Sequence, residues 1–249
     1  MKKFGLIFAG VLLLIGAIIV FVPATLINGR LAAATGGRLN LAEASGTVWR
    51  GEGAMTDAKN TWQLPLAWKL DAASLASGDL ALTLSPVRNA TQPSGTIKLS
   101  TSGIALANFR GTIPAQALVA MLALRDAPAL GGDISVDAPA FRWNGASGEG
   151  ALALSWMRAR LATTAGSADL GTVDIAVTPQ DARLIGRVSN AGGEVAISGT
   201  IGLTSSGNEG DLTIAPLPGA PPALLRALAA FGTADANGAV RVSWRNSGR

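Results

Sequence analysis

The chain repeatedly places a glycine before a short run in which apolar and polar residues alternate. The run at Gly78 reads GDLALTLSP, and comparable runs begin at Gly95, Gly132, Gly150, Gly171, Gly193, Gly199, Gly210 and Gly238. Alternation with a period of two is typical of a β-strand, and a leading glycine is typical of a turn. We therefore expect many short strands. Because the runs differ in length, we do not expect a propeller or a solenoid with a fixed repeat.

One face of each expected strand is apolar. Leu80, Leu82 and Leu84 share a face, and the same spacing joins Ile97 with Leu99, Ile134 with Val136, Leu152 with Leu154 and Trp156, Val173 with Ile175 and Val177, and Val240 with Val242 and Trp244. The opposite faces carry Ala, Thr, Ser, Lys, Asp and Arg, which is typical of antiparallel sheets. The sheet must close as a roll or sandwich or leave a groove, and we favour a closed core.

Three segments have a helical pattern instead. Residues 24–35 follow an apolar run and end at Gly36 and Gly37, whereas Pro114–Arg125 and Pro221–Phe231 each open with proline, a residue suited to the first helical position. We expect two or three short helices. The order of strands, proline-led helix and strands occurs twice, so residues 45–145 and 146–249 are two halves with a similar pattern.

The N-terminus contains nineteen consecutive residues, Phe4–Val22, without a charge, an amide or a hydroxyl. As a helix this stretch would extend about 28 Å, close to the hydrocarbon thickness of a bilayer. A cleaved signal peptide is the alternative, but its apolar core is usually shorter and ends at a small-x-small site, which is lacking here. We therefore expect a retained transmembrane helix at residues 4–22.

Lys2 and Lys3 precede the apolar stretch and determine its expected orientation. Positively charged flanks remain in the cytoplasm. The expected organisation is a cytoplasmic N-terminus at 1–3, the span at 4–22, a connecting helix and linker at 23–44, and an exported β domain at 45–249. This arrangement is typical of a single-pass protein of the bacterial inner membrane with a periplasmic body.

Charge and cysteine content restrict the partners. Without Lys2 and Lys3 the chain carries 18 Lys and Arg against 16 Asp and Glu. It is nearly neutral, with no basic run, so we expect no nucleic-acid partner. The absence of cysteine excludes disulfides and thiolate metal sites.

Catalytic constellations are lacking as well. With no histidine, a Ser-His-Asp or Cys-His unit cannot form. Asp133 and Asp137 lie four apart on one strand face, where they could hold a cation or act as an acid and base, but solvated side chains explain them better. Asp169 and Asp174 would face opposite ways. We expect no enzymatic activity, no metal and no cofactor.

Arg158 and Arg160 follow Trp156 on one expected strand. They could contact an anionic lipid or an acidic partner. A solvated face is the simpler explanation.

The stretch SGTVWRGEG, from Ser45 to Gly53, is the most distinctive motif. We expect Val48 and Trp49 to alternate within a strand, with Trp49 in the core rather than at a docking surface. Gly46 and Gly51 would provide turn or bulge geometry at the strand ends.

The stretch WQLPLAWKL follows, with Trp62 and Trp68 six residues apart. Even spacing puts both indoles on one face unless Pro65 resets the strand. Proline argues for an edge or a bulge at this place, and an edge could accept a partner strand.

An apolar span, a short helix, these two tryptophan-containing stretches, the GDLALTL run and the closing DANGAVRV at Asp235–Val242 together resemble protein N of the bacterial type II secretion system. The resemblance implies a single inner-membrane anchor and a periplasmic β body. It also implies a non-catalytic accessory role, in contact with the inner-membrane platform or the secretin. Gly46, Val48, Trp49, Gly51, Trp62 and Trp68 then belong to family motifs with a structural or docking role.

The glycine-led strands are also similar to those of AsmA-like proteins. That resemblance implies a curved sheet that holds or transfers lipid. Phospholipid is therefore the alternative partner.

The orientation can be tested with a reporter that is active only in the periplasm. Fused after Arg249 it should be active, and the mature protein should still begin at Met1, because Lys2 and Lys3 hold the N-terminus inside. Activity confined to a cytoplasmic reporter, or a mature start near Ala24, would contradict the retained anchor.

Overall fold

The computed structural model describes residues 22–88, 91–121, 129–163, 166–204, 207–222, 224, 228 and 234–247. The predicted span at 4–22 lies outside this part of the chain except for Val22, and so do Lys2 and Lys3. Among the described helices, none is both long enough and apolar enough to cross a bilayer.

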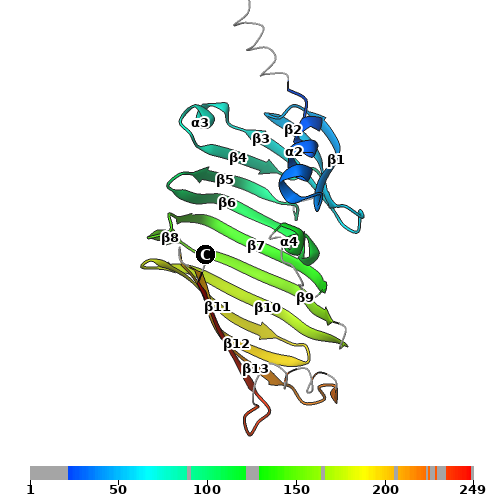
Figure 1. Ribbon diagram of the computed structural model, residues 1–249, viewed down its shortest axis with the longest axis vertical. Coiled ribbons are helices and arrows are strands. Elements are labelled where there is room, and N and C mark those ends of the chain that lie inside the picture. The colour runs from blue at the N-terminus through cyan, green and yellow to red at the C-terminus, as the bar shows by residue number, and fades with distance from the viewer. Residues whose placement is uncertain are drawn as a thin grey trace, which may run out of the picture.

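The described chain forms one long antiparallel sheet of 14 strands in which each strand pairs with its neighbours in sequence (Figure 1). Only β8 departs from this path, since it pairs with β7 alone. The strands are β1 (Leu39–Gly46), β2 (Arg50–Asp57), β3 (Gln63–Leu70), β4 (Leu80–Ser85), β5 (Ser94–Ser100), β6 (Gly103–Pro114), β7 (Ala129–Trp143), β8 (Gly148–Gly150), β9 (Leu152–Thr163), β10 (Gly166–Gln180), β11 (Arg183–Ala191), β12 (Val195–Thr204), β13 (Gly207–Pro216) and β14 (Val240–Ser247).

The sheet is open, and this corrects the expectation of a closed roll or sandwich. β1 and β14 are the two ends of the strand order and do not pair with each other. The predicted antiparallel, mainly β fold is confirmed. The groove, which we ranked below a closed core, is the arrangement that the strand order allows.

Three short helices have their full bounds within the described residues: α2 (Thr25–Thr35), α3 (Ala72–Ala76) and α4 (Ala115–Met121). α2 and α4 fall within predicted helices, whereas α3 was not expected. The third predicted helix, Pro221–Phe231, lies mostly outside the described residues, although Leu224 and Leu228 are buried there.

Cross-strand register places the apolar residues of successive strands on one face, which we call the apolar face. Leu41 lies opposite Met55, which lies opposite Leu64. The row continues through Leu82 and Ile97 on β4 and β5, Leu106 on β6, Ile134 on β7, Trp156 on β9, Val173 on β10, Val188 on β11, Ile201 on β12, Leu212 on β13 and Val242 on β14. The other side, the polar face, carries the ion pairs. The period-two pattern therefore determines which side of the sheet avoids water.

β-Bulges keep this pattern where strict alternation fails. Arg158 has φ of 51°, beside a register shift between β7 and β9. Strict alternation would put Trp156, Arg158 and Arg160 on one face. The bulge instead places Ala159, which is fully buried, in the same apolar cluster as Trp156, which is partly buried. Both arginines are exposed.

Helices cover only parts of the apolar face. Ile27 and Leu31 of α2 pack over Leu41 and Trp68 at one end of the sheet. Ala117 of α4 packs with Trp62 and Leu64. Figure 1 shows both helices on the same side of the sheet.

Two boundaries differ from the sequence expectation. β1 begins at Leu39, so the sheet starts inside the segment assigned to the linker at 23–44. β7 pairs with β9 across the junction at 145/146, so the two expected halves share one continuous sheet.

Trp68 should contribute strongly to stability because it is 7% exposed and its indole lies against Gly51, where an added Cβ would be 2.6 Å from Trp68 Cζ2. We expect Trp68→Ala to lower the free energy of unfolding by about 3–5 kcal/mol. Urea unfolding of the chain without residues 1–22, followed by circular dichroism, measures this. Trp49→Ala is the control, because Trp49 is only half-buried and should cost less. Equal losses would contradict this assignment of the core.

Candidate functional site

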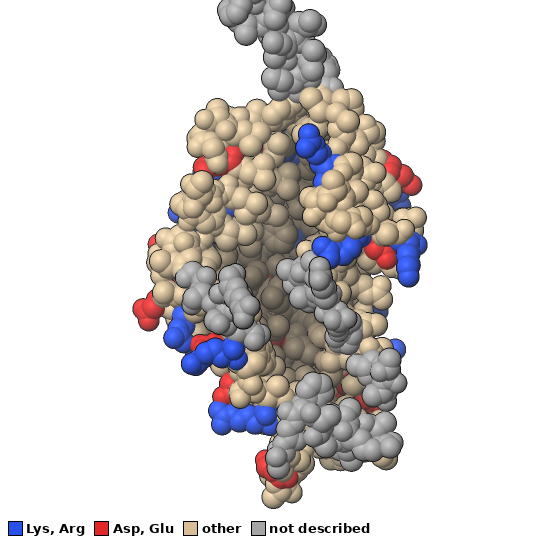
Figure 2. Space-filling model, viewed as in Figure 1, with Lys and Arg blue, Asp and Glu red and all other residues tan. Residues whose placement is uncertain are grey.

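The least covered part of the apolar face lies across the middle strands. Seen from the side of α2 and α4, the molecule is hollowed there, and the atoms within the hollow are mostly uncharged whereas Lys, Arg, Asp and Glu lie around its margins (Figure 2). We call this hollow the groove. Its floor carries apolar side chains that are only partly buried, among them Leu80, Leu82, Leu84, Ile97, Leu106, Phe109, Val136, Leu154 and Trp156. Leu99 is 42% exposed.

The two ends of the apolar face are better covered. Leu39 and Leu41 are buried below α2, and Val195 and Val240 are each 1% exposed in the cluster that contains Leu224 and Leu228. The groove therefore differs from the two ends in that most of its apolar side chains stay partly exposed.

Polar groups on this face are already satisfied. The indole N–H of Trp156 donates to the Gly131 carbonyl at 2.8 Å, and that of Trp68 donates to the Val48 carbonyl at 3.1 Å. Asn190 donates to the carbonyls of Leu170 and Val195 and accepts from the Ile197 N–H. No buried side-chain nitrogen or oxygen in the described residues lacks a partner. The groove thus offers dispersion and burial rather than hydrogen bonds.

The carboxylates considered for chemistry lie on the polar face, each with its own arginine. Asp137 accepts from Arg110 Nε at 3.1 Å, and Asp133 pairs with Arg158. No group of three or more potential metal ligands occurs in the part of the chain that the structure describes. Ion pairs between strands account for both aspartates.

Asp169 and Asp174 do not face opposite ways, although their odd spacing predicts it, because two register shifts between them leave Leu170 and Val173 buried on the apolar face and both aspartates on the polar face. Asp169 Oδ1 accepts the Gly171 N–H at 2.9 Å beside a register shift, and Asp174 is exposed. Arg160 is exposed as well. Asp169 and Arg160 line one depression of the polar face with Asp133 and Arg158, whereas Asp174 is not among the residues that line it.

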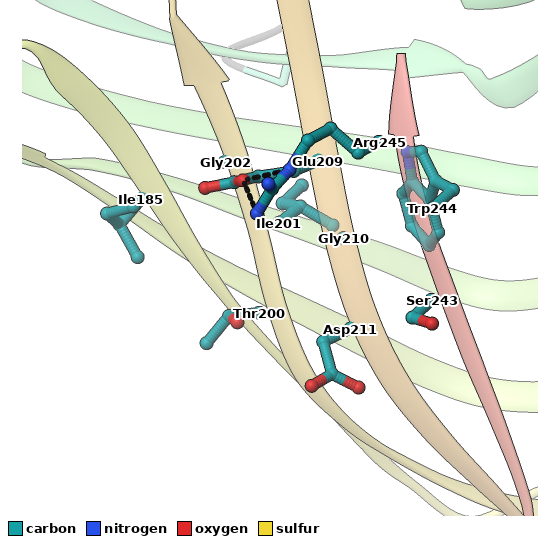
Figure 3. A pocket seen from close by; sticks show the side chains of 10 residues that line it. All are labelled: Ile185, Thr200, Ile201, Gly202, Glu209, Gly210, Asp211, Ser243, Trp244 and Arg245. Atoms are coloured by element: carbon teal, nitrogen blue, oxygen red, sulfur yellow. Dashed lines mark hydrogen bonds and ion pairs between the residues drawn. The ribbon is translucent and has the colours of Figure 1, made fainter.

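A second depression, of about 470 Å³, lies across β11–β14 (Figure 3). Glu209 accepts from Arg183 at 2.6 Å and from Arg245 Nε at 3.2 Å, so one carboxylate serves two guanidinium groups. Arg241 makes a two-point contact with Asp211, which lowers the pKa of the Asp211 carboxyl and raises the pKa of Arg241. The charged residues that line the depression are Glu209, Asp211 and Arg245, and Arg183 and Arg241 pair with these carboxylates from beside it.

The SGTVWRGEG motif forms the turn between β1 and β2, not a strand as expected. Gly46 ends β1 with φ of 84° and pairs with Gly51 on β2. The Val48 N–H donates to the Val22 carbonyl at 3.0 Å, and the Trp49 carbonyl accepts the Leu70 N–H at 2.7 Å. The paired backbones approach so closely at Gly46 and Gly51 that a Cβ at either position would clash. The turn therefore requires glycine at both positions.

Trp62 and Trp68 lie on the same face, at 8% and 7% exposure, and each belongs to a core cluster that includes Leu31 of α2. Pro65 pairs with Ala54 on β2 and lies beyond the part of β3 that β4 reaches. β3 is thus an interior strand with a local edge at its proline.

Sequence reasoning found the apolar face but missed the side chains that cover the outer backbone of the edge strand β1. Asn28 and Thr35 on α2 bind the outer backbone of β1. Neither belongs to a recognisable motif. The available signal was a polar side chain on a helix that also carries Leu26, Ile27 and Leu31.

A model of the family described as type II secretion system (T2SS), protein N, matches residues 37–243. No curated protein and no solved structure matches the chain. The matched region runs from just before β1 to the middle of β14, so it includes the groove and the turn motif.

Proposed function

Because this chain belongs to the type II secretion system protein N family, we propose that it is a non-catalytic component of that machinery, held in the inner membrane by residues 4–22. Its sheet then binds partner subunits of the inner-membrane platform or the secretin on the periplasmic side. The observation that carries the proposal is the extent of the family match, which covers nearly the whole sheet.

The chemistry of the described residues supports a binding role. Asp133, Asp137 and Asp211 are each engaged by an arginine, which leaves no carboxylate pair poised for acid and base catalysis among them. The sheet instead offers a long surface with one apolar and one charged side. Such a surface suits docking of other proteins.

The anchor is supported by the sequence. Membership in a secretion machinery implies a place in the cell envelope, and Phe4–Val22 is long enough to span a bilayer. In this arrangement α2 begins three residues after the span, which would hold the β1 end of the sheet near the membrane.

Co-purification tests the proposal. The full chain, tagged after Arg249 and solubilised mildly from cells that express the secretion genes, should retain platform or secretin subunits. Deleting the gene should impair export of the type II substrates, and the wild-type chain should restore it. Intact export after deletion, together with no retained subunit, would overturn the proposal.

The open groove favours a second candidate, in which the apolar face holds acyl chains of phospholipid. A buried peptide would lose hydrogen bonds on a floor whose polar groups are already satisfied, whereas an alkyl chain has none to lose. Each methylene transferred from water contributes about 0.8 kcal/mol. The groove can therefore bind lipid without any dedicated polar contact.

Native mass spectrometry of the purified chain distinguishes the two candidates. If the groove holds lipid, phospholipid should co-purify with the wild type and be lost in Leu82→Asp, which should remain folded because Leu82 is only half-buried. The matched control is Val195→Asp, at a 1% exposed position, which should unfold because the new charge is buried without a partner. A lipid-free wild type, or an unfolded Leu82→Asp, would reject the lipid candidate.

A further inference from the structure

The outer backbone groups of the two edge strands, β1 and β14, are covered to different extents. The outer edge of β1 is closed by α2, because the Leu41 N–H donates to Asn28 Oδ1 at 2.8 Å and the Leu39 N–H donates to Thr35 Oγ1 at 3.2 Å. The strand end is closed as well, by the antiparallel bridge between Pro23 and Thr47. A further strand cannot add to β1 without displacing the helix.

At the other edge, the described residues close β14 only where it begins. Ala234 forms an antiparallel bridge with Val240, and the Asp235 N–H donates to the Ala239 carbonyl at 2.9 Å. The Ala239 carbonyl therefore points away from β13. Successive residues of a strand direct their backbone N–H and C=O groups to opposite edges. The backbone groups of Arg241, Ser243 and Arg245 therefore also point away from β13.

Ser243 and Arg245 present an open strand edge. β14 is the last strand of the order, and none of the described residues pairs with the outer backbone of Ser243 or Arg245, whereas Arg241 adjoins the bridge between Ala234 and Val240. Unpaired N–H and C=O groups along an edge are a template for a further strand.

The side chains beside this edge specify what would pair with it. Arg241 and Arg245 lie on the polar face with side chains 72% and 83% exposed, and Val242 and Trp244 lie on the apolar face. Together with Arg183 they share only Asp211 and Glu209, so the polar side of the edge keeps a net positive charge. A complementary strand has acidic residues on one face and apolar residues on the other.

We propose that β14 accepts, by strand addition, an extended segment of a partner protein in which acidic and apolar residues alternate. This inference rests on the proposed protein-binding role and names the contact through which one partner binds. Backbone hydrogen bonds to Ser243 and Arg245 supply the pairing, and the side chains of Arg241 and Arg245 select the acidic face.

A second copy of this chain fits the edge poorly. If two β14 strands paired about a two-fold axis at Ser243, Arg241 of each copy would lie opposite Arg245 of the other. Like charges directly opposite each other destabilise a strand pair. The same arginines that select an acidic strand therefore oppose self-association through this edge.

Proline substitution tests the pairing without disturbing β13. The Ser243 N–H points outward, so Ser243→Pro removes a donor that the incoming strand needs, whereas Ser243→Ala keeps it. The full chain in lipid nanodiscs is titrated against a fluorescent peptide of alternating Glu and Val, and anisotropy reports binding. We expect Ser243→Pro to weaken binding about tenfold or more and Ser243→Ala to leave it within about twofold.

Charge selection is tested with the wild-type and Arg245→Gln chains. A peptide with Lys in place of Glu should bind at least about tenfold more weakly to the wild type, and Arg245→Gln should narrow that difference. If Ser243→Pro fails to fold, judged by circular dichroism, the Arg245→Gln comparison decides alone. Equal affinity for the Glu and Lys peptides, or Ser243→Pro and Ser243→Ala binding alike, would overturn the proposal.

Two further measurements separate this contact from the proposed function. A photo-crosslinker at Ser243 in cells should capture a secretion subunit at an acidic, alternating segment. Co-purification of the subunits that survives in a folded Ser243→Pro, with no such crosslink, would reject the β14 contact and leave the secretion role in place. A crosslink to a second copy, or a dimer lost on Ser243→Pro, would show self-association and reject the acidic partner.

Discussion

A sheet with one apolar face must either hide that face from water or bind something that does. Thirteen consecutively paired strands present such a face here, and the described helical residues cover it at α2, at α4 and around Leu224 and Leu228. Removal of apolar surface from water is the main force that stabilises folded proteins. The core is therefore concentrated at the two ends, around Trp68 and around Val195, and the middle of the sheet is left as the groove. Burial and binding capacity both depend on this imbalance between strand and helix.

The sequence predicted the strands and their faces because the relevant rule is local. Alternation identifies Leu80, Leu82 and Leu84 as one face without reference to the rest of the chain, and the structure places them on the apolar face. The same local rule assigns Arg158 to the wrong face. A bulge is a property of two paired strands, so Trp156 and Arg158 appear to share a face until the register with β7 is known. Whether the sheet closes depends on still longer-range geometry, and our preference for a closed core was wrong for that reason.

The turn between β1 and β2 illustrates a different limit. Ser45–Gly53 was recognised as distinctive, yet its residues were assigned to a strand because Val48 and Trp49 are typical strand residues. Gly46 and Gly51 decide the outcome, since their paired backbones approach too closely for any side chain. The edge of β14 could not be predicted at all, because no single strand carries the information that it is the last one. Candidate sites formed by the order of strands become visible only in the assembled sheet.

Strict pairing of neighbours has a consequence for how the chain is made. Every strand of the main path, from β1 to β14, bonds to the strand before it and the strand after it in sequence, with only the short β8 bypassed. The loops to be closed are short, and local pairing is favourable for rapid folding. As the chain is made from its N-terminus, it can therefore add one strand at a time to a growing sheet. The last strand of the path is β14, so the edge that we assign to a partner becomes available only after the other strands have formed.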